Sequence, residues 1–168
     1  MTTEVVTANS LGGNGGVSFD GSESGAAQPQ AIVNTTVGPF GGLGGDPFQD
    51  PASGQITKIT IGAGSVVDSI QTTYAMPGGT SKSLKHGGDG GVPTDIDFNA
   101  GEHIIAIIGR AGRVLDSIAI LTEDQSGVRR TFGPFGGGGG DQFIIHGKVD
   151  GFFGRSGGVI DQIGFFVS

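Results

Sequence analysis

The chain has 168 residues, of which 36 are glycine, 7 are proline and none is cysteine, so a disulfide framework, a thiolate nucleophile and a cysteine-based zinc site are excluded. Isoleucine, valine, leucine and phenylalanine supply 45 residues, enough apolar material for one folded domain of this length. With 9 basic and 16 acidic residues the net charge is −7, and the lack of a basic stripe argues against nucleic-acid binding.

The first 30 residues differ from the rest of the chain, because they combine the glycine-rich stretch Gly12–Gly16 with the polar segment Gly21–Gln30. We expect residues 1–30 to form an N-terminal extension, either a partly ordered arm or an added strand, and residues 31–168 to form one domain. The start lacks the basic and apolar regions of a secretory signal. No apolar run approaches the roughly 18 residues of a membrane helix. We therefore expect a protein that is cytoplasmic or released without a classical signal peptide, with no membrane insertion.

After residue 30, short β-branched segments alternate with glycine clusters, which is typical of an all-β sandwich, barrel or prism. The predicted strands in equivalent positions are 55–61, 102–108 and 142–146. Each precedes a Gly-x-x-x-Asp motif with two aliphatic residues before the aspartate. These motifs end at Asp68, Asp116 and Asp161, so the steps between them are 48 and 45 residues.

A second motif, a glycine loop, recurs with the same period. The segment Gly38–Phe48 matches Gly133–Phe143 two periods later, and Gly87–Gly91 lies between them. Two interleaved series with one period indicate a single supersecondary unit used three times. The three units begin near Gly38, His86 and Gly133. Because three small sheets cannot each bury an apolar face alone, we expect a threefold arrangement around a shared core.

Each aspartate is followed, cyclically, by a glycine loop. Asp68 precedes Gly87 by 19 residues, Asp116 precedes Gly136 by 20, and Asp161 returns to the first loop by closure. A fixed carboxylate accepts hydrogen bonds from hydroxyl groups, and glycine lets a ligand approach backbone amides closely. This combination suits a carbohydrate and needs no metal. The alternative is a repeated structural turn in which each aspartate bonds only its local backbone.

The Gly38 loop, the Gly-x-x-x-Asp series and the C-terminal Gly154–Gly164 segment together resemble jacalin-related lectins over about residues 31–168. The resemblance implies a β-prism I of three four-stranded Greek-key sheets with a pseudo-threefold internal repeat, no catalysis, no metal and no cofactor. It also implies a primary sugar site made by Gly41–Gly45 and Gly157–Asp161, in which Asp161 and two neighbouring amides, those of Gly158 and Val159, hold the sugar.

Mannose/glucose-type specificity is favoured over galactose. The galactose-specific members of the family have a proteolytically freed glycine at the first loop, whereas 37 residues precede Gly38 here. Some of them also carry an aromatic pair where this chain has Gly158-Val159. We expect mono- and oligosaccharides and glycoproteins as partners, and self-association into a homo-oligomer. The main alternative is a protein-interaction or structural module on the same fold without sugar binding.

The repeat predicts up to three sugar sites. In the Asp116 site, Arg113 stands where the last repeat has Gly158, so it can crown the pocket, pair with Asp116 or partly block it. The candidate sugar-binding residues are Gly41, Gly42, Gly45, Gly157, Gly158, Val159 and Asp161 in the primary site, Gly64, Val66, Asp68, Gly87 and Gly88 in the second, and Gly112, Arg113, Val114, Asp116, Gly136 and Gly137 in the third.

An enzyme is not expected. The three histidines, His86, His103 and His146, lack the spacing of a zinc protease motif, and the chain has no nucleophile elbow or phosphate-binding loop. The pair Asp95 and Asp97 could suggest glycosidase acid–base chemistry or calcium binding, but their neighbours favour a solvated turn.

Overall fold

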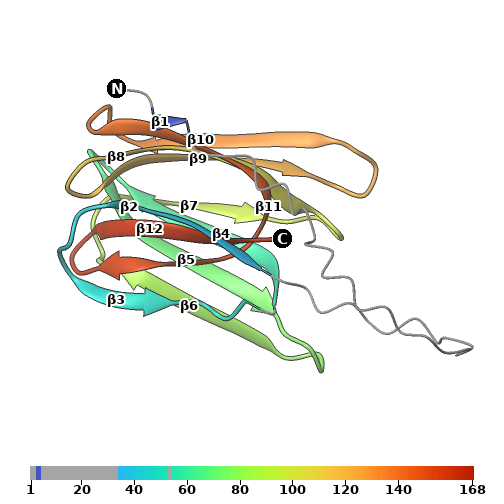
Figure 1. The fold of residues 1–168 in the computed structure, drawn as a ribbon. Helices are drawn as coiled ribbons and strands as arrows, with labels where there is room; N and C mark the ends of the chain where they lie inside the picture. The colour runs from blue at the N-terminus through green and yellow to red at the C-terminus, as the bar shows by residue number, and fades with distance from the viewer. Residues whose placement is uncertain (1–2, 5–33, 53) are drawn as a thin grey trace, which may run out of the picture.

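The computed structural model describes residues 3–4, 34–52 and 54–168, and all of their regular structure is β-strand (Figure 1). The prediction of an all-β chain is confirmed. Among these residues no helix is long and apolar enough to cross a membrane. The strands are β1 (Thr3–Glu4), β2 (Thr35–Gly41), β3 (Asp46–Gln49), β4 (Gln55–Ala63), β5 (Val67–Ala75), β6 (Ser81–Gly87), β7 (Val92–Asp97), β8 (His103–Ala111), β9 (Leu115–Glu123), β10 (Arg129–Gly136), β11 (Asp141–Ser156) and β12 (Ile160–Val167).

The same strand order occurs in two parts of the chain. One sheet has the order β6-β5-β4-β7, and the larger sheet contains the equivalent run β10-β9-β8-β11. In both, the fourth strand returns to lie beside the first, which is the Greek-key connection. Strand β11 is long enough to belong to two groups: residues 141–146 pair with β8, and residues 149–156 pair with β12. The end of β11 also pairs with β3, and β12 pairs with β2.

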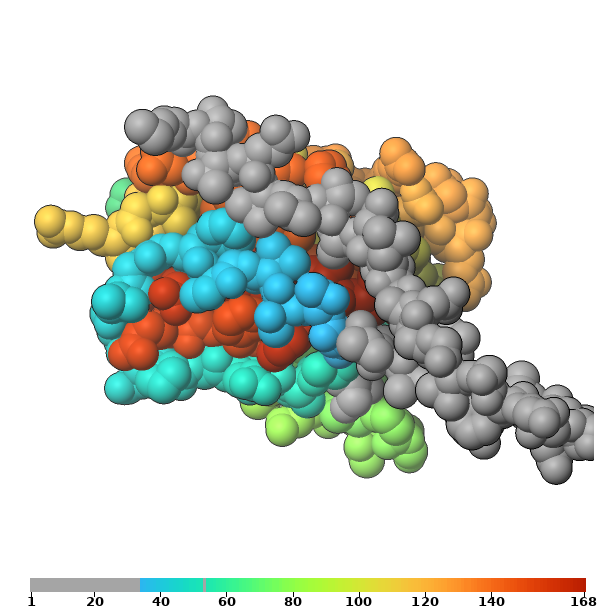
Figure 2. Space-filling view, in the orientation of Figure 1, coloured from blue at the N-terminus to red at the C-terminus, as the bar shows by residue number. Residues whose placement is uncertain are grey.

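Figure 2 shows the face built by β2, β12 and β3, in which the red band that includes β12 lies between the blue of β2 and the teal of β3. Strand β1 lies parallel to β11, with Thr3 opposite Phe143 and Glu4 opposite Ile144. The other residues of the predicted N-terminal extension lie outside the described part of the chain.

One hydrophobic core draws equivalent side chains from all three repeats. The residue immediately before each motif aspartate is fully buried, and so is the residue two positions after it. Phe40 of β2 stacks on Phe143 of β11 with the ring centroids 4.2 Å apart, which joins the first and third repeats. The buried side chains that flank the three aspartates are Val67, Leu115 and Ile160 before them, and Ile70, Ile118 and Ile163 after them. This burial fixes the backbone that carries each aspartate.

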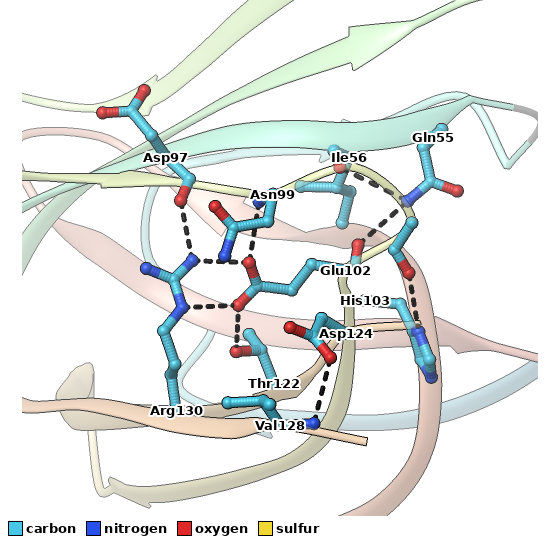
Figure 3. A network of polar contacts seen from close by, with 11 residues as sticks. Gln55, Ile56, Asp97, Asn99, Glu102, His103, Thr122, Asp124, Val128 and Arg130 are labelled. Carbon is cyan, nitrogen blue, oxygen red and sulfur yellow. Dashed lines mark hydrogen bonds and ion pairs between the residues drawn. The ribbon is translucent and has the colours of Figure 1, made fainter. Parts of the chain in front are cut away.

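A buried carboxylate organises the end of β8 opposite to the Asp116 turn (Figure 3). The Glu102 side chain is 1% exposed, and its oxygens accept hydrogen bonds from Arg130 Nε at 2.8 Å, Arg130 Nη2 at 2.5 Å, Thr122 Oγ1 at 2.5 Å and the Asn99 amide at 2.7 Å. Burial by itself raises the pKa of Glu102, but these hydrogen bonds outweigh it and hold the pKa below its ordinary value. Strand β8 begins at His103, one residue later than predicted.

A second buried carboxylate joins the first repeat to the second. Asp50 is 1% exposed, accepts a hydrogen bond of 2.5 Å from Tyr74 Oη, and lies 2.6 Å from His86 Nε2. The ring of Phe48 stacks on His86 with centroids 3.8 Å apart. Burial and the neighbouring Asp50 raise the pKa of Tyr74 far above its usual range. His86 is therefore part of this buried contact, and His103 and His146 lie in β8 and β11.

The prediction of a solvated turn around Asp95 and Asp97 is wrong. Both lie in β7, which pairs with β4. Asp95 accepts hydrogen bonds from Lys58 Nζ at 2.9 Å and Thr60 Oγ1 at 2.6 Å on the exposed face of that sheet. Because these cross-strand partners lie more than 30 positions away in the sequence, the neighbouring residues could not reveal them.

Candidate functional site

The carboxylate of Asp161 lies directly beneath the backbone of the first glycine loop, residues 41–45, which connects β2 to β3. The amide of Gly42 donates to the carbonyl oxygen of Asp161 at 2.9 Å. A methyl group at Gly45 would lie 2.6 Å from Oδ2 of Asp161, and one at Gly44 would overlap Oδ1. Only glycine therefore allows this close approach between loop and carboxylate.

The same arrangement recurs around Asp68. The amide of Gly88 donates to the carbonyl oxygen of Asp68 at 2.9 Å. Methyl groups at Gly90 and Gly91 would lie 2.6 Å from Oδ1 and Oδ2 of this carboxylate. The second glycine loop, residues 87–91, thus covers Asp68 as the first covers Asp161.

Asp116 forms the third copy. The amide of Gly137 donates to its carbonyl oxygen at 2.8 Å, and methyl groups at Gly139 and Gly140 would lie 2.6 Å from Oδ1 and 2.5 Å from Oδ2. Each aspartate therefore contacts the glycine loop that follows it in the sequence, with the first loop following Asp161, as predicted.

The three sites form a closed ring at one end of the molecule. The second glycine of every loop is packed so closely against the motif turn of a neighbouring repeat that a methyl group there would overlap a carbonyl oxygen. Figure 1 shows the turns between β2 and β3, β8 and β9, and β11 and β12 at the same end. The packed pairs are Gly42 with Arg113, Gly137 with Ser65, and Gly88 with Gly158.

The loops and turns share one backbone conformation. The first and last glycine of each loop have positive φ, for example 122° at Gly41 and 64° at Gly45, a region that other residues rarely adopt. The first glycine of each motif turn donates to the carbonyl of the valine two residues later at 3.0 Å. These glycine–valine pairs are Gly64–Val66, Gly112–Val114 and Gly157–Val159. In each site the valine and the aspartate are half-buried.

The three sites differ in the residues at their outer edge, although the contacts between aspartate and glycine loop are the same. The central loop residue is Leu43 in the first, Asp89 in the second and Gly138 in the third, and the Leu43 side chain is 84% exposed. Arg113 is exposed, and within the described residues it forms no ion pair with Asp116. Of the three roles considered for Arg113, pairing with Asp116 is therefore not observed.

The candidate residues predicted from the sequence include the first two glycines of every loop and, in the first loop, Gly45, whereas the fourth and fifth glycines of each loop cover the carboxylate. Of the fourth glycines, none is among those candidates. These fourth glycines are Gly44, Gly90 and Gly139. Their places in the aligned Gly-Gly-x-Gly-Gly series could have indicated them. Two arginines that bind the loops, Arg110 and Arg155, were also missed. No group of three potential metal ligands occurs among the described residues.

Comparisons with known proteins indicate one family and one fold. The family described as jacalin-like lectin domain matches residues 37–166. Horcolin of Hordeum vulgare is 33% identical over 144 residues, which cover 79% of this chain and 95% of that protein. The structure of wild-type Malaysian banana lectin is similar with a TM-score of 0.74 at 34% identity, covering 81% of this chain and 99% of that one. A mannose-specific jacalin-related lectin from Morus nigra, solved in complex with mannose, has a TM-score of 0.71 at 26% identity and covers 84% and 98%.

Proposed function

The chain belongs to the jacalin-like lectin domain family, a non-catalytic family of carbohydrate-binding proteins, and from this membership we propose that it binds mannose- and glucose-type glycans at three metal-independent sites. The observation that carries the proposal is the threefold repetition of a carboxylate beneath glycine backbone, at Asp68, Asp116 and Asp161. We also propose that the strands form the three-sheet β-prism I, in which each sheet supplies one motif turn.

The chemistry of each site suits vicinal hydroxyl groups. An ionised carboxylate is an acceptor with two oxygens, so it can take hydrogen bonds from two neighbouring sugar hydroxyls. Backbone amides of the loop and the motif turn donate to the same hydroxyl oxygens, and no side chain other than the aspartate is required. In the primary site the proposed groups are Asp161, the amides of Gly158 and Val159 in the motif turn, and the backbone of the loop Gly41–Gly45. The mannose named for the Morus nigra lectin supports mannose as the first ligand to test.

Three sites at one end of a rigid body favour branched glycans. Each monosaccharide site of this open kind is expected to be weak, but a ligand that reaches two sites makes the second binding event intramolecular. The ring of loop contacts keeps the spacing of the sites constant. Avidity for glycoproteins would then come from this spacing without additional contacts.

The direct test is an NMR titration of ¹⁵N-labelled protein with methyl α-mannoside in the presence of EDTA, with methyl α-galactoside as the comparison sugar. Saturable shifts of the loop amides around all three aspartates, at lower concentrations of the mannoside, are expected. A crystal soaked with the same sugar would count the occupied sites. Absence of saturable shifts would favour the rival protein-interaction module, and loss of binding in EDTA would refute the metal-free mechanism.

A further inference from the structure

Two of the three glycine loops are held by an arginine that reaches them from the strand before the motif turn. Arg155 donates from Nε to the carbonyl of Gly44 at 3.0 Å and from Nη2 to the carbonyl of Gly45 at 2.7 Å. Arg110 makes the same two bonds, at the same two distances, to Gly139 and Gly140. In both sites the acceptors belong to the two glycines that cover the aspartate.

The Asp68 site has no such arginine, because Gly62 occupies the equivalent position two residues before the motif turn. A methyl group at Gly62 would lie 3.3 Å from the carbonyl oxygen of Gly90 in the loop and 2.5 Å from Oγ of Ser69, so a side chain here would face the loop once the Ser69 hydroxyl turns aside. The position is therefore directed at the loop in all three repeats, and one repeat lacks the side chain.

The second loop is tied instead by an exposed ion pair. Lys85 Nζ lies 2.5 Å from Oδ1 of Asp89, whose side chain is 96% exposed. The hydrogen bond from Lys85 lowers the pKa of Asp89. Exposed ion pairs of this kind contribute little to stability and are screened by salt. A planar guanidinium that donates two hydrogen bonds also fixes the orientation of the two carbonyl groups it binds.

The arginine contacts act on the groups that would meet a sugar. The peptide unit is planar, so holding the carbonyls of Gly44 and Gly45 also fixes the N–H directions of Gly45 and Asp46. Glycine loses more conformational freedom on ordering than any other residue. A loop that is already ordered before the ligand arrives avoids that cost at the moment of binding.

We infer that Arg155 and Arg110 are positioning residues that pre-order the glycine loops of the Asp161 and Asp116 sites, and that the Asp68 site has the most mobile loop and the weakest, most salt-sensitive binding. The inference rests on the proposed sugar-binding function for its affinities, but not for its prediction about loop order, which applies to the sugar-free protein.

The test uses Arg155→Gln and Arg155→Lys in the full chain, with Arg129→Gln as the matched control. Arg129 is an arginine whose side chain is 72% exposed and which pairs with Glu123 at 2.7 Å, away from the glycine loops. Backbone amide order parameters are measured without sugar, and the affinity of each site for methyl α-mannoside is measured from the shifts of its own loop amides. Thermal unfolding reports any general loss of fold.

Arg155→Gln should raise the mobility of the Gly44 and Gly45 amides and weaken the Asp161 site about tenfold, comparable to ordering roughly one residue's backbone on binding. The other two sites should keep their affinities. Arg155→Lys should recover part of both effects, because lysine keeps the charge but lacks the planar pair of donors. The control should change neither readout.

Unchanged loop order in Arg155→Gln, or an equal loss at all three sites, would overturn the inference. Should the wild-type protein bind no mannoside, the proposed function fails, and the order parameters alone decide whether the arginine positions its loop. The reverse experiment is Gly62→Arg. Arg110 lies opposite Ser117 on the neighbouring strand, and Gly62 lies opposite Ser69 in the same way, so the chain already holds an arginine opposite a serine at the equivalent position. This variant should order the second loop and remove the salt sensitivity of the Asp68 site.

Discussion

Replacing Asp161 by asparagine separates the role of the carboxylate from the shape of the site. The two side chains have nearly the same volume, and Asp161 is half-buried, so the fold and the Gly42 hydrogen bond to its carbonyl should persist. What changes is the acceptor capacity beneath Gly44 and Gly45. The amide keeps one oxygen and presents donors where a sugar hydroxyl would donate.

The size of the effect follows from the contacts that are lost. A hydrogen bond to a charged group contributes about 1.5–3 kcal/mol. Since about 1.4 kcal/mol corresponds to tenfold in affinity, loss of one such bond should weaken the site roughly tenfold to a hundredfold. Loss of both would remove measurable monosaccharide binding at this site.

The assay is a calorimetric and NMR titration of Asp161→Asn with methyl α-mannoside, alongside the matched variants Asp68→Asn and Asp116→Asn. Each single variant should lose one site and retain the other two, and the loop amides should show which site is lost. Thermal unfolding should change little. Unchanged affinity at the Asp161 site in a correctly folded variant would refute the assignment of its carboxylate to sugar binding.

Three further predictions concern stability and the fit of the loops. Because hydrogen bonds hold the pKa of Glu102 below its ordinary value of 4.5, its contribution to stability is complete above that pH and should be lost as the pH falls further. Arg130→Ala, which removes the charged partner of this carboxylate and leaves the bonds from Thr122 and Asn99, should cost about 1.5–3 kcal/mol in denaturant unfolding. Tyr74 is the chain's single tyrosine and its pKa is raised, so tyrosinate absorbance should appear near pH 10 only in unfolded protein, and stability should decline as the pH rises above about 10. Gly139→Ala would place a methyl group 2.6 Å from the carboxylate beneath it and should abolish mannoside binding at that site, whereas Gly138→Ala, which has open space around it, should preserve binding in the same NMR titration.

Much of the fold follows from local pattern. β-branched segments between glycine clusters predict strands, and residues 55–61 lie within β4 as expected. The common period of the two motif series predicted which glycine loop meets each aspartate, because similar segments at a regular spacing are expected to pack in a similar way. That argument needed no knowledge of individual contacts, and it located all three carboxylate–loop pairs.

The β-class, the three copies of the Gly-x-x-x-Asp motif and the pairing of each aspartate with a glycine loop can be read from the amino-acid sequence, since strand propensity, motif spacing and glycine placement are local properties of the chain. The atoms that approach one another between distant segments are known from the three-dimensional arrangement alone. This arrangement placed Arg155 on carbonyls about 110 positions earlier in the chain, and it ran β11 as one strand through two groups of strands. It also buried Glu102 against Arg130. Such contacts depend on side-chain directions and distances between segments far apart in the sequence, which no short motif encodes.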